Sequence, residues 1–305
     1  MALIPCLAEP QTRVEPVRIG ILSAGTDSAK SFSDSLQQLG YVEGQNIILD
    51  HRSAEGNLNL LPYLIGELLR LKPAVIVASG PTATAPTIAA TRMVPIVMVD
   101  GGNPISRGFV ETLALPGGNV TGISGTTSTI DGKQLELLKD ACPSISRVTV
   151  LNGINNPGLI SRYERVAKAL GVMVDSVELQ DGIDLERAFA RISAAQPHAL
   201  ITARNFLTLR YSREIADYAL RMRLPSMFGS RGFVQDGGLM SYGLNTRRSW
   251  QRAAIFVDKI LKGANPASLP VERPLFELVV NLQTANKIGR IIPPEILLEA
   301  NEVIK

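Results

Sequence analysis

Polar residues and helix-start signals follow several apolar runs of this sequence, and their chemistry suits an anion. Ser79-Gly80-Pro81-Thr82 comes directly after one run, with a proline suited to the first helical position and two hydroxyls beside it. Asn155-Asn156-Pro157 has the same form, and Ser23-Ala24-Gly25 follows the first run. The first N–H groups of a helix lack partners and carry partial positive charge, so these loops suit a carboxylate or a polarised carbonyl. The alternative is that each loop only caps its own helix.

Arg204 adds a full positive charge to this set. It directly follows a buried run that begins at Ala199, and an arginine there is costly to desolvate unless an anion or a protein carboxylate pairs with it. We expect Arg204 to face a ligand carboxylate; pairing with a neighbouring acidic side chain and exposure to solvent are the alternatives. The full set of expected ligand-binding residues is Ser23, Ala24, Gly25, Ser79, Gly80, Thr82, Asp100, Asn103, Asn152, Asn155, Arg204, Asn205, Arg231 and Tyr242.

Motifs that would support catalysis are missing from the sequence. It contains no G-x-S-x-G elbow, no phosphate-binding loop and no G-x-G-x-x-G after the first apolar run. Its two histidines, His51 and His198, are far apart and have no cysteine cluster beside them. We therefore predict a protein that is not an enzyme, with no catalytic residues, no metal site and no cofactor.

Strands and helices must alternate to position these loops. Short β-branched runs closed by glycine, asparagine or proline predict strands at residues 18–22, 46–51, 74–78, 96–100, 147–152, 174–179, 199–204, 226–229 and 239–242. Apolar residues at helical spacing lie between most of them, as in Leu60, Leu64, Leu68 and Leu71. This alternation predicts βαβ units, and strands that are nearly all apolar predict parallel sheets covered on both faces. The fold class that follows is α/β, with two Rossmann-like lobes around parallel central sheets.

A break in the alternation marks the lobes. Residues 116–129 are rich in glycine and threonine and carry no helical stripe, so we expect the chain to cross between lobes there. Two further crossings, after residue 243 and before residue 276, would complete a three-segment hinge with a ligand cleft between the lobes. The predicted division is a residual signal or tail at 1–16, lobe 1 at 17–122 and 244–275, and lobe 2 at 123–243 and 276–305.

Composition limits the classes of partner. A chain of 305 residues with 45% hydrophobic and 19% charged residues is typical of a globular protein with two domains. Its 31 basic and 28 acidic residues are scattered, so we expect no nucleic-acid partner. Residues 1–16, with the small-residue step Cys6-Leu7-Ala8, are similar to the end of a secretory signal; a disordered cytosolic tail is the alternative.

Seven short motifs occur in order along nearly the whole chain. They are LGYVEGQNI at 39–47, AEG at 54–56, ASG at 78–80, PGGNVTG at 116–122, GGLMSYG at 237–243, ILKGA at 260–264 and FELVVNL at 276–282. In this series the chain resembles the ABC-transporter substrate-binding protein family that includes streptococcal tryptophan-binding lipoproteins. The resemblance implies a type I periplasmic-binding-protein fold, a signal peptide largely absent from this chain, and ligand delivery to a membrane permease driven by a separate ATPase subunit.

Two departures from the family pattern bear on the ligand. Gly102-Asn103-Pro104 stands where relatives commonly have Gly-Asp-Pro, and Ala203-Arg204-Asn205 where many have Leu-Pro-Asp. The loss of one negative charge and the gain of one positive charge favour a more anionic ligand than that of a typical relative. We predict a monomeric extracytoplasmic (periplasmic) solute-binding protein that captures an amino acid or an aromatic or aliphatic carboxylate, with an ABC permease and its ATPase subunit as partners.

Two other kinds of protein share this scaffold, a ligand sensor and an enzyme. A sensor of the repressor type would carry a helix-turn-helix before the first strand, which sixteen proline-rich residues cannot supply. An enzyme would need a nucleophile or a base that the motifs do not provide.

Overall fold

The chain forms two compact units, each assembled from several segments. In the computed structural model, residues 15–25, 30–125, 130–153, 158–180 and 185–305 are described, with only the main chain of Phe206. Unit 1 comprises Met1–Val99, Gly108–Gly122 and Trp250–Val271, and unit 2 comprises Asp100–Arg107, Ile123–Ser249 and Glu272–Lys305. The expected signal remnant, up to residue 14, and the candidate site residue Asn155 lie outside the described residues. The lobe boundaries given above stay a prediction.

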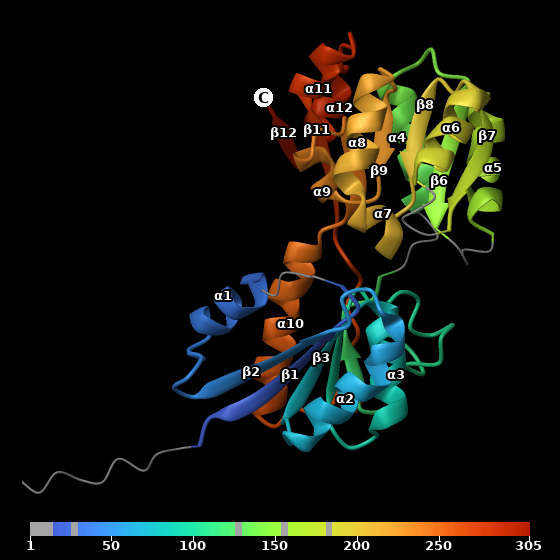
Figure 1. The fold of residues 1–305 in the computed structure, drawn as a ribbon. Coiled ribbons are helices and arrows are strands. Elements are labelled where there is room, and N and C mark those ends of the chain that lie inside the picture. Colours follow the sequence, from blue (N-terminus) through green and yellow to red (C-terminus); the bar gives the residue numbers. More distant parts are fainter. Residues whose placement is uncertain (1–14, 26–29, 126–129, 154–157, 181–184) are drawn as a thin grey trace, which may run out of the picture. The chain divides into compact units, whose positions relative to one another are not determined.

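Unit 1 is built on a parallel sheet in the order β2-β1-β3-β4-β5. Its strands are β1 (Val17–Ser23), β2 (Ile47–Ser53), β3 (Val75–Ser79), β4 (Ile96–Val99) and β5 (Val120–Gly122). Helices α2 (Leu61–Arg70) and α3 (Gly80–Ala90) cover one face, where Leu68 and Ala83 share a core with Ile76 and Ala78 (Figure 1). Elsewhere in unit 1, Phe32 of α1 (Lys30–Gln38) meets the ring of Trp250 in α10 (Thr246–Leu261) edge-on, with centroids 5.8 Å apart.

Unit 2 contains a larger sheet in the order β12-β11-β10-β9-β8-β6-β7. Its strands are β6 (Arg147–Gly153), β7 (Met173–Leu179), β8 (Ala199–Thr202), β9 (Ser226–Phe228), β10 (Met240–Leu244), β11 (Phe276–Asn281) and β12 (Glu302–Ile304). Only β10 and β11 pair antiparallel among these strands. This direction change gives the unit a mixed but mainly parallel sheet.

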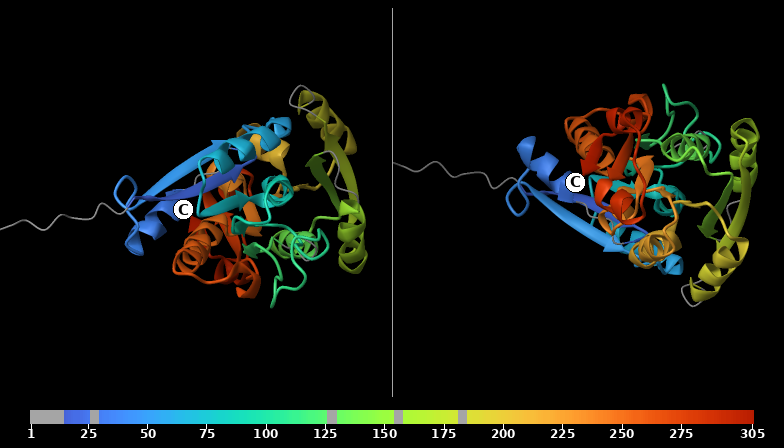
Figure 2. Two further views of the ribbon diagram at one scale, coloured as in Figure 1. Left: turned by 90° about the horizontal axis from the view of Figure 1, so that it is seen from below. Right: turned by 90° about the horizontal axis from the view of Figure 1, so that it is seen from above.

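Helices cover both faces of the unit 2 sheet. One core includes residues of α4 (Ile130–Ala141), α5 (Leu159–Leu170), α11 (Leu282–Lys287) and α12 (Pro294–Glu299). The other includes residues of α6 (Leu185–Ala195), α8 (Ser212–Arg221) and α9 (Arg231–Gln235), and α7 (Phe206–Arg210) precedes α8. Figure 2 shows α5 and α6 on opposite sides of the β6–β7 edge. Alternate residues of a strand point to opposite faces, so Val150 packs with the first group and Leu151 with the second.

The predicted α/β class with parallel-dominated sheets in two lobes is confirmed. Two helical details are corrected: Leu60 is exposed, and the buried face of α2 carries Leu61, Ile65 and Leu68. Across the described part of the chain, the helices are too short or too polar to span a bilayer.

Candidate functional site

Three serines meet at the carboxyl edge of the unit 1 sheet. Ser23 at the end of β1 is the register partner of Ser53 in β2 and of Ser79 in β3. The hydroxyls of Ser23 and Ser53 each donate to the Gly25 carbonyl at 2.8 Å. These bonds hold the Ser23–Gly25 turn against the sheet edge, where ligands of open α/β sheets bind.

Ser23 also lies beside His51, and its other hydrogen bond indicates which atom donates in this contact. Ser23 Oγ is 3.3 Å from His51 Nε2. With the hydroxyl proton donated to Gly25, the ring nitrogen is the donor in this contact. The contact then helps to position the turn.

Helix α3 begins at the same edge. Ser79, 9% exposed, is its N-cap residue, yet its side chain makes no capping hydrogen bond. Gly80 has a φ of 75°, which favours glycine, and Thr82 is exposed in the first turn. The start of α3 thus combines an uncapped main chain with an exposed hydroxyl, a combination that suits a negatively charged group.

Unit 2 carries a cavity of about 80 Å³ at the carboxyl edge of its own sheet. The starts of α4 and α5 form one part of its wall, and the residues that end or follow β8, β9 and β10 form the other. The lining residues are Ile130, Asp131, Gln134, Leu159, Arg162, Ala203, Arg204, Gly229 and Leu244.

A buried ion pair lines this cavity. Arg162 Nε donates to Asp131 Oδ2 at 2.5 Å, and the two side chains are 21% and 10% exposed. Burial raises the pKa of Asp131, and the Arg162 guanidinium partly offsets this rise. The pair joins α4 to α5 and places opposite charges side by side at the cavity wall.

Gln134 is held rigidly beside this pair. Its Oε1 accepts from the Tyr163 hydroxyl at 2.7 Å, and its Nε2 donates to the Tyr242 carbonyl at 2.7 Å. Burial raises the pKa of Tyr163 well above its usual value, so this hydroxyl stays a donor. The Tyr242 ring is half-buried and packs near Phe276, with centroids 5.9 Å apart, and burial raises its pKa too.

Arg204 brings a second guanidinium to the cavity. It follows β8 by two residues, is exposed, and makes no ion pair or hydrogen bond with another residue that the structure describes. The chain approaches it closely at Gly229, because a Cβ there would lie 2.7 Å from Arg204 Cβ. Asn205 instead completes a capping box at α7: its Oδ1 accepts from the Thr208 N–H at 3.0 Å.

Asn152 is buried near the end of β6, on the same sheet face as Val150. Its Oδ1 has no hydrogen-bond partner among the described residues. The neighbouring strand is β8, with Leu151 in register with Thr202. Asn152 therefore lies one strand away from Ala203, which lines the cavity.

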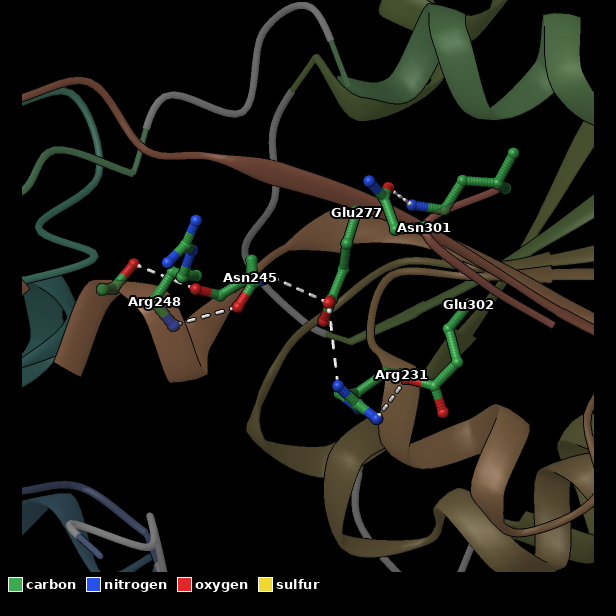
Figure 3. A network of polar contacts seen from close by, with 8 residues as sticks. Arg231, Asn245, Arg248, Glu277, Asn301 and Glu302 are labelled. Atoms are coloured by element: carbon green, nitrogen blue, oxygen red, sulfur yellow. Dashed lines mark hydrogen bonds and ion pairs between the residues drawn. The ribbon is translucent and has the colours of Figure 1, made fainter. Parts of the chain in front are cut away.

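Arg231 belongs to a different network, drawn in Figure 3. Its guanidinium lies 2.7 Å from Glu302 Oε2 and 3.7 Å from Glu277 Oε2. Asn245 Nδ2 also donates to Glu277 Oε2, at 2.9 Å. Burial raises the pKa of Glu277, while Arg231 and Arg247 lower it and Glu302 raises it further. Two protein carboxylates thus already balance the charge of Arg231.

Asp100 and Asn103 both lie in the first segment of unit 2. Asp100 is buried and accepts from the Ser249 hydroxyl at 2.7 Å. Asn103 is exposed, and its Oδ1 accepts from the Ser106 N–H at 3.1 Å. Their hydrogen bonds hold the 100–107 segment to unit 2 and form a local turn within it.

The structure therefore groups part of the expected set. In unit 1 it gathers the Ser23–Gly25 turn, Ser79 and Gly80 at one sheet edge. Of the expected unit 2 residues that the structure describes, Arg204 alone lines the cavity. Sequence reasoning did not find Asp131, Gln134 or Arg162, although Asp131 and Gln134 stand on the buried stripe of α4 with Leu135 and Leu138. The signal that could have identified Asp131 and Gln134 is the occurrence of polar residues on an apolar helical stripe.

Comparisons with known proteins agree with this architecture. A profile of the family described as "ABC transporter substrate binding protein" matches residues 23–304. The tyrosine-binding protein of Clostridioides difficile (strain R20291) is 24% identical over 259 residues, which cover 84% of this chain and 74% of the relative.

Solved structures of 21–22% identity share the fold. A conserved domain protein from Vibrio cholerae superposes with a TM-score of 0.85, and a domain from Streptococcus pneumonia in complex with L-Trp superposes with 0.84; each covers 95% of this chain and 100% of the other. A ligand-free, open substrate-binding protein from Clostridium difficile gives 0.71, covering 95% and 99%. The matched family consists of solute-binding proteins and not of enzymes. Because its profile covers nearly the whole chain, this protein belongs to the ABC transporter substrate-binding protein family.

Proposed function

We propose that this protein is the extracytoplasmic solute-binding component of an ABC importer, which captures an amino acid or another small organic carboxylate and passes it to a membrane permease with its ATPase subunit. The observation that carries the ligand class is the unit 2 cavity, where Arg204 lies beside the Asp131–Arg162 pair. Two guanidiniums and one carboxylate leave an excess of positive charge. A monomer outside the cytoplasm is part of the proposal.

The ligands of two relatives support an amino acid. One relative is named as a tyrosine-binding protein, and one structure contains L-Trp. Both ligands carry an ammonium group and a carboxylate. In this chain, Asp131 is suited to the ammonium group and Arg204 to the carboxylate.

Unit 1 supplies a second set of expected contacts. The Ser23–Gly25 turn and the Ser79–Thr82 helix start offer hydroxyls and main-chain N–H groups. The rest of the proposed set is Asp100, Asn103, Asn152, Asn155, Asn205, Arg231 and Tyr242. Asp100, Asn205 and Arg231 already serve the structural contacts described above.

A thermal-shift screen of the purified protein tests the proposal. Tyrosine, tryptophan and aliphatic amino acids are compared with their deaminated acids, with neutral sugars and with amines. A ligand at 100 times its Kd adds about 2.7 kcal/mol of stability, which raises the Tm by several degrees. Stabilisation by sugars or amines without stabilisation by carboxylates would contradict the proposed ligand class.

Arg204→Ala tests the assigned contact once a carboxylate ligand is known. We expect its affinity to fall at least about tenfold, because a charge-assisted hydrogen bond is lost. Arg191→Ala, an exposed arginine of α6, is the matched control and should leave affinity unchanged. If Arg204→Ala binds as tightly as the parent protein, the carboxylate stands but this residue does not hold it.

A further inference from the structure

A second cavity, of about 300 Å³, lies at the opposite edge of the unit 2 sheet. The loops that enter β6, β8 and β9 form most of it, so it lies at the amino ends of three adjacent parallel strands. Its volume is at the lower end of the range of about 300–1,000 Å³ found for ligand pockets. The lining residues are Ser144, Ile145, Pro197, His198, Arg223, Leu224, Pro225 and Arg290.

The charged residues that line this cavity are two arginines. Arg223 and Arg290 both line it, and no aspartate or glutamate is among its described lining residues. Within the described part of the chain, neither arginine forms an ion pair. Lys139 adds a further positive charge behind the wall, where its Nζ donates to the carbonyls of Pro143 and Ile145 at 2.8 Å each.

His198 contributes a directed donor. The Ser146 N–H donates to His198 Nδ1 at 3.2 Å, so this ring nitrogen is an acceptor. The ring proton then resides on Nε2, which is left as a hydrogen-bond donor. Arg223, Arg290, His198 and Ser144 thus line the cavity together with Ile145, Leu224 and Pro225, which are here called its apolar base.

We propose that this cavity binds a phosphate group, as a second site separate from the solute-binding site. Guanidinium forks match the oxygens of phosphate and bind them in pairs. A phosphate monoester carries about −1.5 to −2 charges at neutral pH, which balances two arginines, whereas a single carboxylate balances one. The apolar base suits a small organic body attached to that group. Free phosphate and a lipid headgroup are the two sources that share this chemistry.

Titration calorimetry of the full chain with inorganic phosphate, at constant ionic strength, tests the site. Arg223→Gln and Arg290→Gln should each weaken phosphate binding at least about tenfold. Arg221→Gln is the matched control, because it removes the same charge two residues away at an exposed position outside the cavity lining. Sulfate should compete with phosphate, and acetate should not. Circular dichroism before titration establishes that each variant is folded.

Three results would overturn the proposal. They are an absence of phosphate binding to the parent protein, binding that survives both cavity substitutions, and an equal loss in Arg221→Gln. The second result would place phosphate elsewhere, for example at Arg204, and would leave the proposed solute-binding function untouched.

A flotation assay separates the two sources of phosphate. Vesicles of phosphatidylcholine are compared with vesicles that also contain phosphatidic acid, whose headgroup is a phosphate monoester. Binding only to the second kind, abolished by Arg290→Gln, identifies a lipid source. Soluble phosphate binding without vesicle binding identifies a free phosphate compound. Both outcomes support the site, whereas vesicle binding that both cavity substitutions leave unchanged counts against it.

Discussion

Arg162 favours the ionised form of Asp131, a buried carboxylate in the wall of the cavity that Arg204 lines. In Arg162→Gln, Asp131 loses the cation that offsets its burial, so its pKa rises further above the usual range. We expect a loss of about 1–3 kcal/mol of unfolding free energy at neutral pH. The loss should shrink on acidification, because a protonated Asp131 needs no cation. Urea denaturation of both proteins at several pH values measures this.

A double variant supplies the control for this prediction. Asp131→Asn combined with Arg162→Gln has neither charge, so its stability difference from the parent should vary much less with pH. A loss in Arg162→Gln that is the same at every pH would mean that the ionisation of Asp131 is not involved.

Glu277 is a second buried carboxylate, 5% exposed, and here the substitution should stabilise the protein. Burial raises its pKa, so the folded protein holds this proton to a higher pH than the unfolded chain does. Its contribution to stability is present below the ordinary glutamate pKa and is lost as pH rises through the folded pKa. Glu277→Gln should therefore gain stability relative to the parent over this window, by about 1 kcal/mol or less.

The control for Glu277→Gln is Glu178→Gln, which changes an exposed glutamate of β7. Its stability relative to the parent should stay level over the same pH range. If Glu277→Gln loses stability as pH rises, the ionised carboxylate stabilises the fold and the argument from burial fails.

At the scale of elements, the close approach of β10 to the residue that follows β9 requires a glycine at position 243. A Cβ at Gly243 would lie 2.2 Å from the Gly229 carbonyl oxygen, and neither main chain can yield cheaply. We expect Gly243→Ala to cost about 1–3 kcal/mol of unfolding free energy and to distort the cavity that Gly229 and Arg204 line. Chemical denaturation checks the first effect and ligand affinity the second.

Gly232→Ala is the matched control. This glycine lies in α9, and its nearest neighbour would be 3.9 Å from an added Cβ. Alanine is the better helix former, so stability should stay level or rise by up to about 1 kcal/mol. Equal losses in the two variants would rule out the close approach at Gly243 as the cause.

Strand positions followed well from the sequence, since every predicted run became a strand with ends shifted by at most two residues. The prediction missed β5, β11 and β12. β5 and β12 have three residues each, and β5 lies in a glycine- and threonine-rich stretch. The six residues of β11 were noted only as the segment that follows a crossing. The sequence was less informative about which face of a helix is buried. Around α2 the chain has leucine or isoleucine at 60, 61, 64, 65 and 68, so two faces are equally apolar and only packing against β1 and β3 selects one.

The same difference between strands and helices applies to the residues of the candidate site. Strand ends can be read from the sequence, which is why Ser23, Ser79 and Arg204 could be placed at or just after the ends of strands. The Asp131–Arg162 contact joins two helices across 31 positions, and its formation depends on how α4 packs against α5. No local pattern encodes that distance.

At the scale of the whole molecule, the single tryptophan reports on one unit. Trp250 is 2% exposed and packs in unit 1 against Phe32. Each unit has its own core, so we expect the two to unfold separately. In Gly243→Ala the circular dichroism transition of unit 2 should shift, while the Trp250 fluorescence midpoint stays where it is in the parent. Coincident shifts of both signals would mean that the molecule unfolds as one cooperative body.

The discontinuous make-up of both units also has a consequence for biosynthesis. Unit 1 has all five strands by residue 122, yet it lacks Trp250 and the rest of its last segment until Val271 has been added. Unit 2 likewise waits for β11 and β12 at the end of the chain. Neither unit can be completed before the segment that ends at Val271 has been synthesised. The chain therefore stays incompletely folded through most of its synthesis, which is compatible with the location outside the cytoplasm proposed above.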